Sequence, residues 1–353
     1  MKILTIANEK GGVGKTTIST QFAFYSALKF GLRVAFLDFD QQGNASSCLK
    51  IKGYCQESEI KAADILLEAK TPDSYTSPFV LFGADDRLSL LEQQGSAAHG
   101  VFADNLIKAL KVMDSHFDLA IIDTNPNPDI RSNLGLIVCT HLVSPIQLTK
   151  EPIDGISRLF ERIQSIAQLN PNLPDGFIGM LPNAVEAGHF QMQNAKELMS
   201  AFGHMLIKEQ FSSIVCDRSP NGQLVPVRDQ DGNVQITEKT GYAGIKRHAG
   251  IAEAQAHGSP MWEESGCSDA WSEMKKAFFA IYEKLDIQRP QSASAEQISV
   301  LDECRRLYGS GSRRLVRQFW MSDSSKGLLG LSPDKINLLR ELKQGSPLSV
   351  LEA

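Results

Sequence analysis

The sequence predicts an α/β fold: a doubly wound, mostly parallel sheet covered by helices on both faces, with a small helical extension at its C-terminal end. Three observations support this prediction. Short, almost wholly apolar runs recur along the chain, each is bounded by turn residues, and most are followed by a segment with helical periodicity. Strands that are apolar throughout are buried on both faces, which is typical of parallel sheets.

The expected elements follow one another in strand–helix order. The strands are "ILTIA", "RVAFLDF", "DLAIID", "HLVSPIQL" and "GFIGMLPNAV". Helices are expected at 15–30, 153–168 and 190–203, and two more at about 245–257 and 268–285 close the domain. We therefore expect one domain over residues 1–287, then a polar linker and an arginine-rich helical extension over 288–353.

Composition narrows the class of protein. A net charge of -5 gives no global basic signature, so any contact with nucleic acid must come from a local patch. Six cysteines without a CxxC pair argue against a disulfide framework, a zinc ribbon or a cluster, and fit a reducing cytoplasm. No run of about 18 apolar residues occurs, so we expect neither a signal peptide nor a membrane span.

The segment "NEKGGVGKTT" at residues 8–17 carries the strongest signal. A strand leads into glycines, which are followed by Lys15, two threonines and an amphipathic helix, as a phosphate-binding loop requires. Backbone N–H groups and the helix N-terminus would face the phosphates, Lys15 would bridge the β- and γ-phosphates, and the Thr16 hydroxyl would bind Mg²⁺. The strict GxxxxGK[ST] pattern fails, because Glu9 stands where it needs glycine. The expected nucleotide contacts in this loop are Gly11, Gly12, Val13, Gly14, Lys15, Thr16 and Thr17.

Two strands end in aspartates. Asp123 closes the apolar run "DLAIID" and reads as the acid that holds Mg²⁺ through water, although strand-end aspartates are also common caps. Asp38 and Asp40 follow "RVAFL" at the carboxyl edge of the neighbouring strand, where solvated acids of a turn are the alternative. Asp38 is expected nearer the metal.

The loop "KGGVGKTT" resembles the deviant Walker A motif of the ParA/MinD superfamily, whose signature lysine matches Lys10. The resemblance implies that Lys15 serves its own nucleotide, while Lys10 reaches across a nucleotide-sandwich dimer to the partner's phosphates. A second cation supplied in trans would neutralise the charge that spreads over the γ-phosphoryl group. ATP hydrolysis to ADP is then expected to depend on dimerisation.

Other segments extend this resemblance, with departures. "FLDFDQQGNAS" is similar to the family's D-x-D-P-Q-G-N-A-S, which implies that Asp40 positions or activates the attacking water, but Gln41 replaces the usual proline. After Asp123 the family usually shows D-T-P-P, whereas this chain has Asn125 at the third place. Asn183 resembles the position that contacts the adenine edge, and a plain strand-end cap remains the alternative.

Within the superfamily, the chain resembles the ParA-type partition ATPases. "HLVSPIQLTKEPIDGISRLFERI" and "IAEAQAHGSPMWE" are similar to family segments, so the resemblance covers residues 1 to about 285. It implies an ATP-bound homodimer that binds DNA non-specifically and is released when a centromere-binding, ParB-like partner stimulates hydrolysis. A reductase with a bridging cluster is disfavoured, because Cys139 is the only cysteine soon after Asp123. A MinD-like membrane regulator is disfavoured too, because the last helix lacks aromatic anchors, and we expect no stable membrane association.

DNA contacts are expected from basic residues in two places. Lys246 and Arg247 in "GIKRHAGIAEA" are expected at the start of a helix, where family members carry DNA contacts, though solvated surface cations are an equal alternative. For the extension, docking of a partner or another copy is expected first, DNA binding second and a passive extension third, and its candidate DNA contacts are Arg313, Arg314 and Arg317. Residues 218–241 are expected to form a β-hairpin insertion with a turn at "DG" rather than a calcium loop.

The sequence therefore predicts a Mg²⁺-dependent DNA-partition ATPase that is cytoplasmic and associated with the nucleoid. One rival is a positioning ATPase that acts on a protein cargo or, like MinD, on a membrane. A second rival is a metabolic ATPase or synthetase whose turnover is accelerated by a small substrate.

Overall fold

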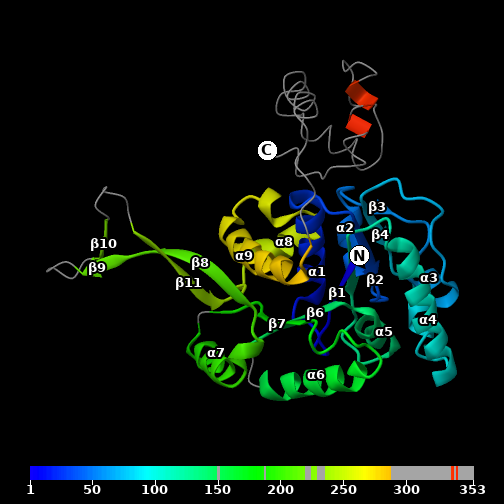
Figure 1. Cartoon of the computed structure of the whole chain (residues 1–353), viewed down its shortest axis with the longest axis horizontal. Coiled ribbons are helices and arrows are strands. Elements are labelled where there is room, and N and C mark those ends of the chain that lie inside the picture. The colour runs from blue at the N-terminus through cyan, green and yellow to red at the C-terminus, as the bar shows by residue number, and fades with distance from the viewer. Residues whose placement is uncertain are drawn as a thin grey trace.

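The computed structural model describes residues 1–148, 152–186, 188–218, 224–228, 235–287, 335–337 and 339–340 (Figure 1). Its centre is a seven-stranded sheet in the order β3-β4-β2-β5-β1-β6-β7, in which every neighbouring pair is parallel. The strands are β1 (Lys2–Ile6), β2 (Val34–Asp38), β3 (Gln56–Glu57), β4 (Phe79–Phe82), β5 (Leu119–Asp123), β6 (His141–Ile146) and β7 (Phe177–Pro182). This arrangement confirms the predicted doubly wound α/β fold.

Helices cover both faces of the sheet. They are α1 (Lys15–Phe24), α2 (Asn44–Lys50), α3 (Ala62–Glu68), α4 (Ser96–Met113), α5 (Ile130–Val138), α6 (Pro152–Ala167), α7 (His189–Phe202), α8 (Ala249–His257) and α9 (Ser268–Leu285). On one face Phe22 of α1 meets Phe278 of α9 edge to face, with ring centroids 5.3 Å apart. On the other face Leu106 of α4 and Leu134 of α5 are buried in one cluster with alternate residues of β2 and β5. The wholly apolar strands are thus buried on both sides, as their sequences predict.

The register of the central strands places the candidate site. β5 lies between β1 and β2, and Asp123 is opposite Ile6 on one side and Asp38 on the other. The loop after β1 and the two strand-end aspartates therefore lie at the same carboxyl edge of the sheet. Ligands of open parallel sheets bind at this edge.

Two details of the secondary structure differ from expectation. Strand β4 and the edge strand β3 lie in short segments that the sequence pattern did not single out, and they extend the sheet beyond β2. The helix expected at 15–30 is α-helical to Phe24 and continues as a π-helical turn over Tyr25–Lys29.

An antiparallel ribbon extends away from the body of the molecule (Figure 1). It pairs β8 (Lys208–Ile214) with β11 (Ile236–Tyr242), and β9 (Cys216–Arg218) with β10 (Leu224–Pro226). The two strands that flank "DQDGN" each pair with an earlier strand, and the Gln235 amide also donates to the Val227 carbonyl at 2.8 Å between them, so the expected hairpin insertion at 218–241 stays a prediction. At the junction the Val215 amide donates to the Gln235 carbonyl at 3.0 Å, and the Val227 amide donates to the Val215 carbonyl at 2.8 Å. The two strand pairs therefore meet at Val215. The predicted turn at "DG" lies outside the described residues.

Little of the C-terminal extension is described. The helix expected at 296–308 lies outside the described residues, whereas 335–337 and 339–340, within the helix expected at 332–343, are helical. Leu339 is buried in the same apolar cluster as α1 and α9. The division into domains at 287/288 stays a prediction.

Candidate nucleotide site

The glycine loop joins β1 to α1 and has the backbone conformation that only glycine adopts freely. Gly12 and Gly14 have φ of +74° and +93°, and α1 begins directly after Gly14. Side chains from two further strand ends hold the loop: Asn183 Nδ2 donates to the Val13 carbonyl at 2.8 Å, and Gln147 Nε2 donates to the Gly12 carbonyl at 2.7 Å. The loop is thus fixed ahead of α1, whose free N–H groups favour an anion.

Lys15 lies at the bottom of this loop. Only 6% of the residue is exposed, and its Nζ donates to the Lys10 carbonyl at 3.1 Å. Burial lowers the pKa of the Lys15 ammonium, while the nearby charges of Asp123 and Asp40 act in the opposite direction. A buried ammonium gains from an anionic partner, so its placement suits a phosphate group.

Asp123, Thr16 and Asp38 gather beside Lys15. Thr16 Oγ1 donates to Asp123 Oδ2 at 2.9 Å, but the buried Asp123 Oδ1 has no hydrogen-bond partner among the described residues. Asp38 accepts from the Ser46 amide at 2.8 Å and from the Ser46 hydroxyl at 2.6 Å. Burial raises the pKa of both carboxyl groups, and for Asp123 the neighbouring Asp38 adds to the effect. A cation bound beside Asp123 and Asp38 would give this oxygen of Asp123 a partner.

These residues fit Mg²⁺. A hydroxyl and carboxylates are the oxygen donors that Mg²⁺ prefers, and in phosphate sites the ion keeps several waters and binds phosphate oxygens directly. Over the described residues no cluster of three His, Cys, Asp or Glu side chains offers a ready-made metal cage.

Asp40 lies in a turn at the same edge. Its amide donates to Asp38 Oδ1 at 3.1 Å, and its own Oδ1 accepts from the Gln42 amide at 3.0 Å. The residue is half-buried, and its charge is close enough to act on Lys15. Asp40 thus lies near Lys15 and the glycine loop. Its action on a water molecule stays a prediction.

Asn183 contacts the loop from the end of β7. The residue is buried, and its amide nitrogen is used on the Val13 carbonyl. This contact supports a bracing role for Asn183, and its expected contact with adenine stays a prediction.

Gly14→Ala is expected to destabilise the nucleotide-free protein by about 1–3 kcal/mol. A Cβ at Gly14 would lie 2.1 Å from Asn183 Nδ2, at a φ of +93° that strains any L-residue. Gly11→Ala is the matched control, because nothing lies within 4 Å of a Cβ there and its φ is not positive. Urea unfolding of both variants tests this; equal stability of the two would contradict the described loop.

Three residues of the site were not predicted. Ser46 and Gln147 lie in segments already noted for their resemblance, "GNAS" and "SPIQ", and those motifs could have indicated them. Arg162 of α6 donates to Glu9 at 3.1 Å and to Asn133 at 2.6 Å, which ties the start of the loop to α5 and α6. No local pattern marks that contact.

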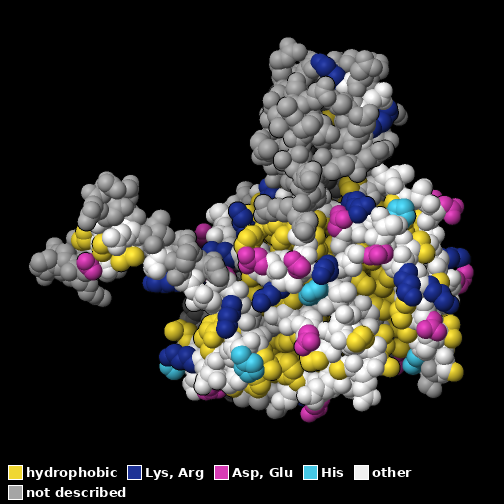
Figure 2. Space-filling model, viewed as in Figure 1, with side chains coloured by type: hydrophobic (Ala, Val, Ile, Leu, Met, Phe, Trp, Pro, Cys, Tyr) yellow, Lys and Arg dark blue, Asp and Glu magenta, His cyan; other side chains and the backbone are white. Residues whose placement is uncertain are grey.

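The basic candidates are placed less simply. Lys246 Nζ lies 2.8 Å from Glu273, and Arg247 Nε lies 2.5 Å from Glu186; both basic side chains remain exposed. They lie just before α8, which begins at Ala249 with His248 at its N-cap position, and their contact with DNA stays a prediction. Arg313, Arg314 and Arg317 lie outside the described residues. On the face in Figure 2 basic and acidic side chains are interspersed, without a large basic patch.

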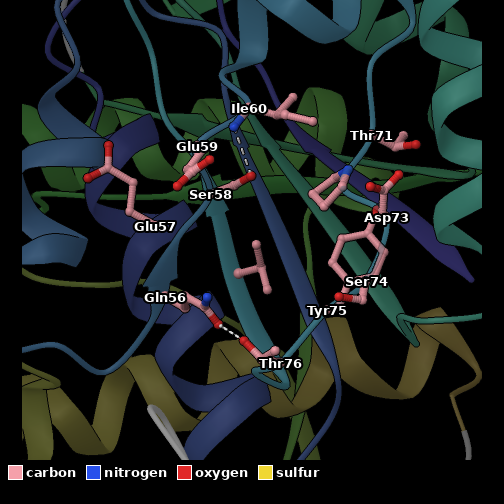
Figure 3. Close-up of a pocket in the computed structure, with 12 residues that line it drawn as sticks. Gln56, Glu57, Ser58, Glu59, Ile60, Thr71, Asp73, Ser74, Tyr75 and Thr76 are labelled. Carbon is pink, nitrogen blue, oxygen red and sulfur yellow. Dashed lines mark hydrogen bonds between the residues drawn. The ribbon is translucent and has the colours of Figure 1, made fainter.

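A separate pocket of about 460 Å³ lies at the β3 edge of the sheet (Figure 3). It is lined by residues 56–60, 71–76 and Val80, and it shares no residue with the glycine loop.

In the described part of the chain, no helix is both long enough and apolar enough to cross a membrane.

Comparison with known proteins agrees with this geometry. Residues 1–174 match the family described as an AAA domain. The chain is 34% identical over 220 residues to protein IncC of Escherichia coli, covering 59% of this chain and 57% of that protein. It is 29% identical over 182 residues to the chromosome-partitioning ATPase Soj of Thermus thermophilus, covering 48% of this chain and 65% of Soj. Both matches thus span less than two thirds of the relative's own length.

Among solved structures, a variant of McdA from Cyanothece in complex with ATP shares the fold. The TM-score is 0.60 at 19% identity, over 83% of this chain and 99% of McdA. The deviant glycine loop, the strand-end aspartates at its side and these relatives agree with one another. Together the motifs, the fold and these relatives support a ParA/MinD-type ATPase.

Proposed function

We propose that the chain is an ATP-dependent partition ATPase that switches between states by binding and hydrolysing ATP. In the proposed cycle an ATP-bound homodimer binds DNA non-specifically, and a centromere-binding, ParB-like partner stimulates hydrolysis and so releases it. One observation carries the proposal: the buried Lys15 Nζ, a donor suited to a phosphate, and Asp123 Oδ1, which has no hydrogen-bond partner among the described residues and suits a metal ion, lie close together at the same edge of the sheet.

Each group has a distinct part in this proposal. Loop amides and Lys15 would bind the phosphates, and Thr16, Asp38 and Asp123 would hold Mg²⁺ directly or through water. The ion would neutralise charge on the phosphate oxygens. Asp40 would orient the attacking water, since it lies in a turn beside the loop.

Lys10 would complete a second molecule's site. Its side chain lies on the exposed part of the loop, whereas its carbonyl is turned inward and accepts from Lys15. The exposure of this cation, two residues before Gly12, supports a role toward a partner's nucleotide. Supplied in trans, it would act as an arginine finger does.

The test is the rate of ATP hydrolysis per protein molecule over a range of protein concentration. A sandwich dimer predicts a rate per molecule that rises with concentration and then levels off, with Mg²⁺ required. A constant rate per molecule would contradict the dimer. Acceleration by a small metabolite, and not by DNA or protein, would favour a metabolic ATPase instead.

The double variant Lys246→Ala, Arg247→Ala is expected to lower DNA affinity about tenfold in the ATP state and to reduce the salt slope by about two. The ion pairs with Glu273 and Glu186 are exposed to solvent and therefore weak, so DNA phosphates can compete for both cations. Filter binding of a random duplex over a salt series measures both effects.

The matched control for that variant is Lys70→Ala. Lys70 also forms an exposed ion pair, with its Nζ 2.6 Å from Glu68, but it lies just after α3 and not before α8. Equal DNA affinity in the double variant and the control would show that the surface before α8 does not bind DNA.

A further inference from the structure

The turn that carries Asp40 has an unusual residue at its second position. The Asp40 carbonyl accepts from the Gly43 amide at 2.8 Å, which closes a four-residue turn with Gln41 and Gln42 at its centre. Proline is favoured at the first central position, because its fixed φ pre-forms the turn. Gln41 has no such restraint in its backbone, so the turn depends on its hydrogen bonds, which are those from the Gln42 and Gly43 amides to Asp40 and that of the Gln41 side chain.

The side chain of Gln41 is held by Arg131 of α5. Arg131 Nη1 donates to Gln41 Oε1, across 90 residues of sequence. Arg131 is only 4% exposed, and its guanidinium is fixed by Asp129, with Nε donating to Oδ2 at 3.0 Å and Nη2 donating to the same oxygen. Because Asp129 also caps the start of α5, the Arg131 fork is anchored before it reaches Gln41.

The same carboxylate reaches the loop after β5. Asn125 Nδ2 donates to Asp129 Oδ2 at 2.6 Å; Asn125 is only 2% exposed, and its Oδ1 has no described partner. Gln41 and Asn125 are both positions where the ParA/MinD pattern shows proline, and proline could make neither bond. Both departures from the pattern are therefore joined to one buried ion pair.

We propose that Gln41 and Arg131 are positioning residues for hydrolysis: their hydrogen bond restrains the Asp40 turn in place of a proline ring. The bond also ties the turn, through Asp129, to the loop after Asp123, so that these two loops at the carboxyl edge of the sheet are held together. This inference rests on the proposed ATPase function and adds to it the device that orders Asp40.

The experiment compares Gln41→Ala with Gln41→Pro. The alanine variant loses the bond and gains no backbone restraint, so kcat is expected to fall about tenfold while KM stays within about twofold. The proline variant also loses the bond but restores the restraint, and no described hydrogen bond uses the Gln41 amide that it removes. Its kcat is expected to return to within about threefold of the natural chain.

Hydrogen exchange provides a readout that does not need hydrolysis. The Gln42 and Gly43 amides donate to Asp40, and they are expected to exchange faster in Gln41→Ala and at the natural rate in Gln41→Pro. Gln193→Ala is the matched control. The Gln193 side chain likewise makes one side-chain hydrogen bond, in which its Nε2 donates to Glu197 at 3.1 Å on the surface of α7.

The outcomes separate this inference from the proposed function. A natural chain that does not hydrolyse ATP overturns the proposed function and the catalytic part of the inference, while exchange still tests the restraint. Hydrolysis with an unaltered kcat in Gln41→Ala overturns the inference alone. So does a loss of kcat in Gln41→Ala that proline fails to restore, or a change in KM alone.

Discussion

Asp123→Asn is expected to lower ATP hydrolysis by about a hundredfold or more and also to stabilise the nucleotide-free protein. Hydrolysis falls because the amide carries no charge to hold Mg²⁺ beside Thr16. Stability rises because Asp123 is fully buried and its Oδ1 has no described partner, so the charged form is costly to keep in the fold. Steady-state hydrolysis and urea unfolding of the same variant measure the two effects.

The pH dependence of stability gives the sign of this effect. Burial raises the pKa of Asp123 in the folded chain above the ordinary value near 4. At pH values above about 4 the folded state therefore binds more protons than the unfolded state. The contribution of Asp123 to stability is full at low pH and is lost as the pH rises through its raised pKa in the folded chain. Asp123→Asn should flatten this decline in nucleotide-free protein, whereas Asp73→Asn, at an exposed position, should leave it unaltered.

A variant that hydrolyses ATP at the natural rate would show that Asp123 does not hold the metal. A variant with lower stability at neutral pH and an unaltered pH profile would show that the buried carboxylate is not costly. The two results are independent, so each tests one half of the prediction.

Arg131→Ala is expected to destabilise the chain by about 3–5 kcal/mol. The change leaves the Asp129 carboxylate buried without its cation and removes the donor to Gln41. Denaturant unfolding measures the loss. Arg33→Ala is the control: Arg33 lies 2.7 Å from Asp118 in an exposed pair, so its removal should cost below about 1 kcal/mol. Similar costs for both variants would show that Arg131 does not neutralise a buried charge.

The sequence predicted the centre of the fold because its signals there are local. The all-apolar runs at β2 and β5, with Asp38 and Asp123 as their last residues, give both the strand and the edge at which the acid lies. The conformation of the loop follows from its glycines in the same way. Parallel pairing then brings Asp38 opposite Asp123.

The contacts that the sequence did not predict are long-range. Arg131 meets Gln41 across 90 residues and Arg162 meets Glu9 across 153, and no periodicity links such positions. The ribbon shows the same limit: alternation identifies strands near 224 and 236, but the choice of partner depends on the whole ribbon. The two-residue β3 is too short to form a pattern.

The most direct test of the account is binding to a duplex of arbitrary sequence, over a salt series, without nucleotide, with ADP and with ATP. A partition ATPase should bind DNA with ATP alone, with binding weakened steeply by salt and altered by Lys10→Ala because the dimer lacks its cation in trans. Absence of DNA binding in every nucleotide state, by protein that still hydrolyses ATP, would contradict a partition ATPase and favour a positioning ATPase acting on a protein or a membrane.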